Sequence, residues 1–258
     1  MGFFTALGFL TVIPRPFRRE VSAEDIGRAL SYFPLVGLLI GLLLAGLNWL
    51  LGLMLPASVV YGLLLVAIVL ITGGLHLDGF ADTCDGTASH RTAEDRLRIM
   101  RDSRVGAFGV IGVFLLLLVK YLSLAGVPGN MVFTTLVLMP VISRWVMVYA
   151  VVAYPYARAA GLGQAFKQGA RWSRFAIATV VALALVLALT RWANISQFYL
   201  ATVVAMLCVW LFALVMANYL KGKLGGLTGD TYGAINEVAE VLVVIIFTLI
   251  ARNHWFGV

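Results

Sequence analysis

Three aspartates stand close together in a glycine-rich segment of the chain, GGLHLDGFADTCDG at 73–86, where they are Asp78, Asp82 and Asp85. On an α-helix with about 100° per residue, the spacing i, i+4 and i+7 points these side chains within roughly 60° of one another. Clustered carboxylates repel one another unless a cation neutralises them. Hard oxygen ligands suit Mg²⁺ or Mn²⁺, particularly when phosphates complete the shell. The segment therefore predicts a site for one of these divalent cations, with a solvated acidic loop as the alternative.

Two neighbouring features suggest contacts to a substrate. His76 lies in the same segment, where it either touches substrate or forms a buried structural hydrogen bond. Asp102 and Arg104 belong to MRDSRVGAFG at 100–109, directly before an apolar run. Backbone N–H groups and the positive end of a helix there can receive a phosphate.

A short interfacial helix is expected between these two segments. Thr92 and Asp95 approximate a capping box, which marks the start of a helix. We expect Arg96 and Arg98 on this helix to anchor to lipid headgroups.

Two basic residues fall inside apolar runs. Arg144, in SRW at 143–145, is costly to bury without a partner, so we expect it to face the interior and to pair with an acid or an anionic ligand. Lys120 lies near the outer end of its run and can extend to the membrane surface, so we expect no functional role for it.

Acidic residues reappear near the C-terminal end, in GGLTGDTYGAINEVAE at 225–240. Asp230 suits the N-cap of a helix by residue type. Glu237 and Glu240 lie within the last apolar run, and carboxylates there indicate a functional site. Salt bridges to Arg144 or its neighbours are the alternative.

The composition indicates a membrane protein. Of 258 residues, 62% are hydrophobic and 12% are charged, whereas soluble domains average about 45–50% and about 25%. This excludes a soluble globular enzyme, a disordered tail and a disulfide scaffold; Cys84 and Cys208 form no motif. The net charge of +7 is scattered along the chain, which excludes a nucleic-acid-binding face.

The apolar runs predict an all-α polytopic fold in one membrane-embedded domain, residues 1–258, with about seven transmembrane helices and short interfacial helices. The runs lie near 33–55, 57–75, 106–127, 131–153, 175–192, 198–219 and 233–251. The second is the weakest and continues into the segment after Gly73 and Gly74 as a broken helix. Most Lys and Arg lie before residue 33 or at 76–105, 154–174 and 220–232, which places the N-terminus and these loops in the cytoplasm.

The chain resembles the cobalamin synthase (adenosylcobinamide-GDP ribazoletransferase) family in several ordered blocks. These are FLTVIPRP at 9–16, YFPLVGLLIG at 32–41, GGLHLDGFADTCDG at 73–86, MRDSRVGAFG at 100–109, SRW at 143–145, YPYAR at 154–158 and GGLTGDTYGAINEVAE at 225–240. The likeness covers nearly the whole chain, and blocks in this order and spacing are highly specific.

The resemblance implies an integral membrane, Mg²⁺-dependent transferase of the bacterial cytoplasmic (inner) membrane, with its active site facing the cytoplasm. Its substrates would be adenosylcobinamide-GDP and α-ribazole or its 5′-phosphate, and its products adenosylcobalamin (or its 5′-phosphate) and GMP. Other enzymes of cobalamin synthesis are conceivable partners, besides the lipid bilayer, and no nucleic acid is expected.

On this basis we assign roles to named residues. The expected metal ligands are Asp78, Asp82, Asp85, Asp230 and Glu237. The expected catalytic residues are Asp82, Asp85, Arg104 and Arg144, with the arginines neutralising charge on the transferring phosphoryl group and departing GMP. The expected substrate-binding residues are His76, Asp102, Arg104, Arg158, Asn236 and Glu240, although Arg158 also fits a plain basic cytoplasmic loop.

Two other functions are weighed against this one. A CDP-alcohol phosphatidyltransferase also splits a pyrophosphate in a membrane, but its opening motif is only partly matched at 82–88 and its second half is missing. A cation or substrate transporter would line a pathway with Arg144, Glu237 and Glu240. Transporters commonly show repeated halves and midplane sites, and the chain has no internal repeat.

Overall fold

The protein is helical throughout the part that the computed structural model describes, residues 2–14, 22–88, 91–159, 161–192 and 199–252. The helices are α1 (Gly2–Leu10), α2 (Ala23–Ala29), α3 (Phe33–Gly52), α4 (Ala57–Thr72), α5 (Leu75–Thr87), α6 (Ala93–Ile99), α7 (Ala107–Ala125), α8 (Gly129–Ala153), α9 (Leu162–Gln168), α10 (Trp172–Trp192), α11 (Tyr199–Leu224) and α12 (Gly229–Arg252). Within those residues the only β pairing is an isolated bridge between Tyr156 and Leu227.

All seven predicted apolar runs form helices. By length and composition, six helices in the described part of the chain can each cross a membrane, and they include α3, α7, α8, α10, α11 and α12. The seventh run is α4, which continues into α5 through a bend of 93°. The prediction of a polytopic α-helical membrane protein with a broken second run is therefore confirmed.

The bend between α4 and α5 is produced by two consecutive glycines. Gly73 and Gly74 have φ values of 62° and 70°, a left-handed conformation that costs other residues free energy. Gly73 N–H and Gly74 N–H donate to the carbonyls of Leu70 and Val69, which closes α4. Helix α5 then starts in a new direction, and it carries the three aspartates.

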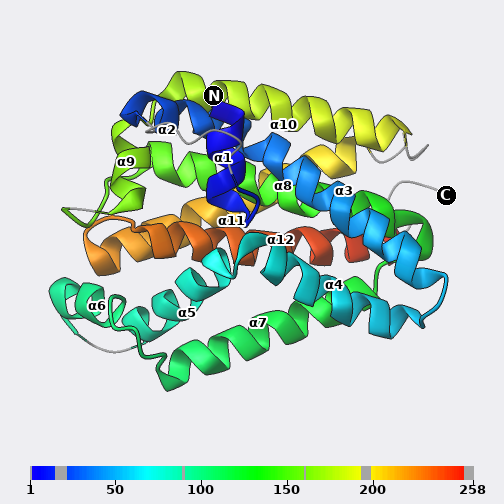
Figure 1. Cartoon of the computed structure of the whole chain (residues 1–258), viewed down its shortest axis with the longest axis horizontal. Coiled ribbons are helices and arrows are strands. Elements are labelled where there is room, and N and C mark those ends of the chain that lie inside the picture. Colours follow the sequence, from blue (N-terminus) through cyan, green and yellow to red (C-terminus); the bar gives the residue numbers. More distant parts are fainter. Residues whose placement is uncertain (1, 15–21, 89–90, 160, 193–198, 253–258) are drawn as a thin grey trace.

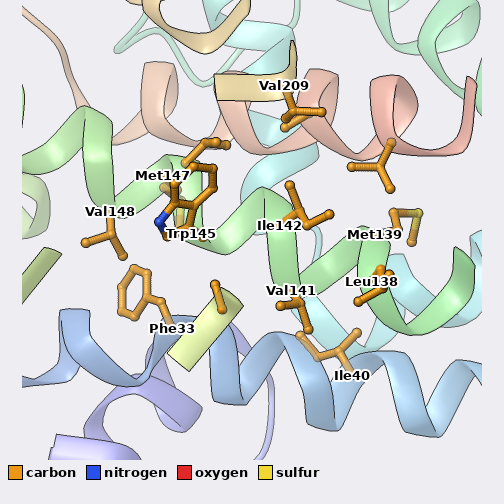
Figure 2. Packing of buried hydrophobic residues seen from close by; sticks show 14 of the residues in the cluster. Phe33, Ile40, Leu138, Met139, Val141, Ile142, Trp145, Met147, Val148 and Val209 are labelled. Carbon is orange, nitrogen blue, oxygen red and sulfur yellow. The ribbon is translucent and has the colours of Figure 1, made fainter. Parts of the chain in front are cut away.

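Helix α8 is the centre of the molecule, with almost all of its side chains buried. It packs closely against α3. A Cβ at Gly37 would lie 2.3 Å from the Pro140 carbonyl oxygen, and a Cβ at Gly41 would lie 2.6 Å from the Val137 Cα. Small residues four positions apart allow such close packing of helices in membranes. Figure 2 shows α8 between Phe33 and Ile40 on one side and Val209 of α11 on the other.

The outer helices expose large apolar side chains. Val66, Phe114 and Val180 are exposed by 55%, 64% and 68%, and they lie on α4, α7 and α10. A soluble monomer rarely exposes so much contiguous apolar surface, whereas hydrocarbon chains of lipid cover it at no cost. This surface supports a membrane location.

The short helices α2, α6 and α9 lie toward one end of the long helices, whereas α1 lies near the middle. Figure 1 shows α6 and α9 at the left end of the long axis and the α3–α4 connection at the other end. Of the basic segments that predict orientation, residues 15–21, with Arg15, Arg18 and Arg19, lie outside the described residues. The orientation of the chain in a membrane stays a prediction.

Candidate active site

Glycines bring α5 and α12 into direct contact. A Cβ at Gly79 would lie 2.8 Å from the Asp230 Cα, and a Cβ at Gly233 would lie 3.0 Å from the His76 Cα. The two helices can approach this closely only because neither residue has a side chain. The contact places the aspartates of α5 beside the first turn of α12.

Asp78 and Asp82 of α5 and Asp230 of α12 form an acidic cluster, in which the negative charges act on one another. The Asp82 carboxylate experiences the charges of Asp230 and Asp78 and, in the opposite sense, that of Arg158. Within the described residues, neither Asp78 nor Asp82 has a side-chain hydrogen bond or ion pair. The cluster therefore offers carboxylate oxygens that remain free to bind a cation.

Arg158 is held at this cluster by a short pairing between two loops. Leu227 N–H donates to the Pro155 carbonyl at 2.8 Å, and Ala157 N–H donates to the Leu227 carbonyl at 2.8 Å. The next residue, Arg158, donates from Nη2 to Asp230 Oδ2 at 2.6 Å. The loops at 154–158 and 225–228 thus place one guanidinium next to the carboxylates.

The N-cap of α12 differs from the prediction. Thr228 Oγ1 accepts a hydrogen bond from Thr231 N–H, and Thr231 Oγ1 accepts one from Thr228 N–H. This reciprocal pair caps the helix, so the expectation that Asp230 is the N-cap is wrong. Asp230 lies inside the first turn, and its carboxylate is left to pair with Arg158.

Asp85 caps a different helix. Its carboxylate accepts hydrogen bonds from Gly106 N–H at 2.7 Å and from Gly109 N–H at 2.9 Å, at the N-terminal end of α7. A negative charge is favourable at this position. These are the backbone donors that the sequence suggests for a phosphate, so Asp85 occupies the predicted phosphate site. Its structural role is clear, and its role as a metal ligand or catalytic residue stays a prediction.

Asp102 and Arg104 lie apart from the acidic cluster. Arg104 donates to both oxygens of Asp102, which lowers the pKa of the Asp102 carboxyl to about 2. Both residues are exposed and line, with Asp85, an open depression of about 590 Å³. Contacts between this pair and substrate remain predictions.

Arg96 and Arg98 differ from each other in environment. Arg96 is buried, and it donates from Nη1 to the carbonyls of Gly86 and Thr87 at the end of α5. The expected lipid anchor is wrong for Arg96, because free carbonyls at a helix end attract a cation. Arg98 is exposed, as expected, and pairs with Asp95.

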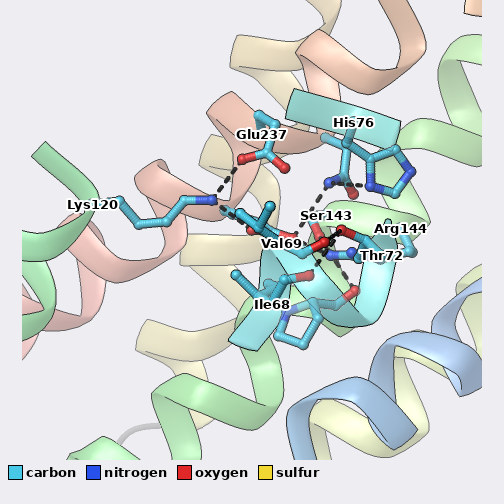
Figure 3. A network of polar contacts seen from close by, with 11 residues as sticks. Ile68, Val69, Thr72, His76, Lys120, Ser143, Arg144 and Glu237 are labelled. Atoms are coloured by element: carbon cyan, nitrogen blue, oxygen red, sulfur yellow. Dashed lines mark hydrogen bonds and ion pairs between the residues drawn. The ribbon is translucent and has the colours of Figure 1, made fainter. Parts of the chain in front are cut away.

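A network of charged side chains lies deeper, between α7, α8 and α12 (Figure 3). Lys120 is 1% exposed and donates to Glu237 Oε2 and Glu240 Oε2, both at 2.7 Å. Arg144 is fully buried and pairs with Glu240 Oε1. The expectation that Lys120 reaches the membrane surface is therefore wrong, because two carboxylates in the interior attract it.

Four residues that the sequence assigns to the site are partners of one another or of Lys120 in this network. Glu237 was expected to bind metal and Glu240 substrate, but Glu237 Oε2 accepts from Lys120, and the two oxygens of Glu240 are paired with Lys120 and Arg144. Arg144, expected to neutralise the departing phosphate, neutralises Glu240, which confirms the alternative of an internal pair. Asn236 donates to Glu240 Oε1 at 3.3 Å and is buried. A buried charge needs a partner within the chain, and these residues supply one another.

A cavity of about 210 Å³ opens beside the acidic cluster. Asp78, Asp230 and Arg158 line it on one side, and His76 and Tyr232 also contribute. Its other walls are apolar and come from α1, α3, α8 and α9: Phe9, Phe33, Met147, Val151 and Phe166. The cavity and the carboxylates form one continuous candidate site.

Several residues of this cavity are missing from the sequence-based assignment. Tyr156 and Tyr232 lie in two of the quoted blocks, and Phe9 and Phe33 are the first and second residues of the two N-terminal blocks respectively. Burial raises the pKa of the Tyr156 phenol, which keeps its hydroxyl protonated and able to donate. Their position inside the quoted blocks was the only signal in the sequence that these aromatic residues belong to the site. That signal is weak, because apolar runs elsewhere in the chain contain similar residues.

The carboxylates at this site supply only part of the ligands of a metal ion. Within the residues that the structure describes, no three His, Cys, Asp or Glu side chains are grouped so as to hold a metal ion. Mg²⁺ in phosphoryl-transfer sites is usually held by one or two carboxylates together with substrate phosphates. One or two of the carboxylates of Asp78, Asp82 and Asp230, together with phosphates of the substrate, fit such an incomplete set of ligands.

Comparison with known proteins gives one consistent result. The family model described as cobalamin-5-phosphate synthase matches residues 2–248. A protein of Roseiflexus sp. (strain RS-1) named adenosylcobinamide-GDP ribazoletransferase is 41% identical over 246 residues, which cover 95% of this chain and 88% of the relative. A protein of Geotalea daltonii with the same name is 41% identical over 254 residues, which cover 98% of both chains. No solved structure matches the chain.

Proposed function

Because the chain belongs to the cobalamin-5-phosphate synthase family, we propose that it transfers the phosphocobinamide part of adenosylcobinamide-GDP to α-ribazole or its 5′-phosphate. The products are adenosylcobalamin, or its 5′-phosphate, and GMP. This is the assembly of the nucleotide loop of cobalamin. The relatives with the name adenosylcobinamide-GDP ribazoletransferase match this chain over nearly their whole length.

The observation that carries the proposal is the meeting of α5, α12 and the loop at 154–158 next to the cavity. Asp78 and Asp82 have no partners within the described residues, and Arg158 is anchored on Asp230. A pyrophosphate needs cationic groups and a metal, and an acceptor hydroxyl needs a group that takes its proton. All of these can be supplied at this one place.

We further propose Mg²⁺ as the cofactor, held by one or two of the carboxylates of Asp78, Asp82 and Asp230 together with phosphates of the substrate. Bound there, it would neutralise charge on the pyrophosphate. The fit rests on oxygen donors without partners on α5 and on the neighbouring Asp230 of α12. Glu237 is left out of this set because it belongs to the buried network with Lys120 and, unlike Asp230, does not line the cavity.

The remaining work is done by the side chains of this chain. Arg158 orients a phosphate by donating from a guanidinium whose position is fixed by Asp230. A carboxylate of the cluster accepts the proton of the attacking ribose hydroxyl. The apolar wall of the cavity keeps water away from the acceptor.

We place the enzyme in the bacterial cytoplasmic membrane with this site facing the cytoplasm. The support is the concentration of Lys and Arg in the segments at the α5–α6 end of the molecule. The alternative of a transporter has less support, since Arg144, Glu237 and Glu240 neutralise charges inside the protein and do not line the 210 Å³ cavity. A CDP-alcohol phosphatidyltransferase is disfavoured by the family match over residues 2–248.

The proposal is tested with the purified full-length protein in lipid nanodiscs. GMP release from adenosylcobinamide-GDP is measured with and without α-ribazole, and with Mg²⁺ or an excess of chelator. We expect release that requires both the acceptor and the divalent cation and that matches the ribazole consumed. Release of GMP without ribazole, or undiminished release in chelator, would contradict the proposed transfer or the proposed cofactor respectively.

A further inference from the structure

The cavity beside the carboxylates has the shape and chemistry of a site for an aromatic ring. Three phenylalanines form part of its wall, with ring centroids 4.4 Å apart for Phe9 and Phe166 and 5.7 Å apart for Phe33 and Phe166. Met147 and Val151 complete the apolar wall. Aromatic and thioether groups favour contact with another aromatic ring.

Three buried donors that line this cavity have no partner within the described residues: His76 Nε2, Arg158 Nε and the Tyr232 hydroxyl. The imidazole of His76 is the deepest of them, and its neighbours show which nitrogen carries the proton. Asn236 Nδ2 donates to Glu240 Oε1, because the carboxylate can only accept, and the same nitrogen lies 3.3 Å from His76 Nδ1. His76 Nδ1 is therefore the acceptor, and the proton of the neutral imidazole lies on Nε2. His76 is 2% exposed and lines the cavity, and its Nε2 is unpartnered.

A buried donor without an acceptor costs free energy, so its presence points to a ligand that supplies the acceptor. Among the parts of the two substrates, a corrin ring is far too large for about 210 Å³. Guanine would carry several donors and acceptors into an apolar wall, where they would lose hydrogen bonds to water. The benzimidazole base of ribazole is apolar except for one unsubstituted ring nitrogen, which is an acceptor.

We infer that this cavity binds the benzimidazole base of ribazole, with His76 Nε2–H donating to the unsubstituted ring nitrogen. The inference rests on the proposed function and adds the position of the acceptor substrate. A base in this position leaves its ribose at the side of the cavity lined by Asp78, Asp230 and Arg158. The acceptor hydroxyl then lies beside the groups proposed to act on the pyrophosphate.

The test combines a change in the ligand with a change in the protein. Ribazole is compared with its indole counterpart, in which a C–H group replaces the ring nitrogen, using wild-type protein and the variant His76→Phe. We expect wild-type protein to have a KM roughly 10-fold to 100-fold higher for the indole counterpart, since the loss of one buried hydrogen bond leaves the donor unpaired. In His76→Phe this preference should fall to about twofold or less, while kcat at saturating acceptor changes less than KM.

A second variant tests the cavity while leaving His76 unchanged. Val151→Phe places a larger side chain in the cavity, and Leu115→Phe makes the same kind of change on the exposed face of α7. We expect KM for ribazole to rise roughly 10-fold or more in Val151→Phe, because the added ring overlaps the base, and to stay within about twofold in Leu115→Phe. Thermal unfolding of both variants shows whether they are folded.

Two results would overturn the inference. One is equal KM values for ribazole and the indole counterpart in wild-type protein. The other is a rise in KM for adenosylcobinamide-GDP but not for ribazole in Val151→Phe, which would assign the cavity to the nucleotide. Failure of the proposed function has a different signature, namely no GMP release by wild-type protein with any acceptor. Equilibrium dialysis of ribazole against wild-type protein and Val151→Phe tests the cavity even in that case.

Discussion

Asp82 combines a position at the centre of the acidic cluster with the absence of any side-chain partner within the described residues. The charged groups that act on it include Asp230, Asp78 and Arg158, which come from two helices and a loop. A side chain of this kind can be changed without breaking a hydrogen bond of the folded protein. Loss of activity on its replacement would therefore report on chemistry and not on folding.

We predict that Asp82→Asn lowers the rate of GMP release by roughly a hundredfold or more, since loss of one group that stabilises the transition state costs about this factor. The amide keeps the size of the side chain but lacks the negative charge that a cation needs. The matched control is Glu94→Gln, an exposed acid on α6, which should retain the wild-type rate. Near-normal turnover of Asp82→Asn would remove Asp82 from the proposed metal ligands.

The buried charges make a second prediction, which concerns stability. Lys120 faces two carboxylates, and Arg144 faces one of them. Lys120→Met removes one cation and leaves two carboxylates with a single counter-ion, which should lower the free energy of unfolding by about 3–5 kcal/mol. Lys221→Met, at an exposed position near the end of α11, should change it by less than about 0.5 kcal/mol.

We expect the loss of stability in Lys120→Met to come from the unbalanced charge of the buried network, and not from the loss of the lysine side chain as such. The double variant Lys120→Met with Glu237→Gln restores one cation against one carboxylate, so it should recover part of the stability lost in the single variant. Thermal unfolding in detergent, followed by tryptophan fluorescence, measures all four proteins. A double variant less stable than Lys120→Met alone would contradict the assignment of these residues to one network.

At the scale of the helices, the close packing of α3 on α8 positions two walls of the cavity. Phe33 comes from the start of α3, and Met147 and Val151 come from α8. The distance between these helices depends on Gly37 and Gly41, whose missing side chains leave room for the backbone of α8. Helix packing by small residues thus sets the width of the candidate site.

Two glycines of α3 provide a matched test of this packing. Gly41→Ala places a Cβ 2.6 Å from the Val137 Cα, where only backbone could move, so we expect a loss of about 1–3 kcal/mol in the free energy of unfolding. Gly46→Ala meets nothing within 4 Å and should be neutral or slightly stabilising. Both are compared by thermal unfolding in the same detergent. Equal stability of the two variants would mean that the α3–α8 distance is not fixed by Gly41.

The helices themselves could be predicted from the sequence because hydrophobic runs and helix signals are local. Gly73 and Gly74 marked the break after α4, and Thr92 marked the start of α6, where its side chain accepts from Asp95 N–H. The partners of Lys120 could not be predicted in the same way, since they lie 117 and 120 residues away along the chain. Only the folded chain shows which acid a buried cation meets.

The same distinction explains the site. The grouping of Asp78 and Asp82 follows from helical spacing, but the contact of α5 with Asp230 depends on tertiary packing at Gly79. Asp85 looked equivalent to the other two aspartates until α7 was seen to begin beside it. Identical residue types in one motif can thus differ in their surroundings, since Asp85 caps α7 whereas Asp78 and Asp82 have no partner within the described residues.

For the molecule as a whole, the side of the membrane that the site faces determines the compartment from which its substrates are taken. The α5–α6 end carries most of the basic loops, and the α3–α4 connection lies at the opposite end (Figure 1). Basic residues in short loops stay in the cytoplasm. The substrates of the proposed reaction would then be supplied from inside the cell.

Single cysteines at the two ends test this orientation. Gly222→Cys lies near the end of α11 and Gly52→Cys at the end of α3, and a Cβ at either position meets nothing within 4 Å. Each is introduced after Cys84 and Cys208 are replaced by alanine, and labelled with a thiol reagent that does not cross membranes. We expect Gly222→Cys to react in inside-out vesicles only and Gly52→Cys in right-side-out vesicles only. The reverse pattern would place the carboxylates outside the cytoplasm, where GDP-activated substrates are not made, and would contradict the proposed location of the reaction.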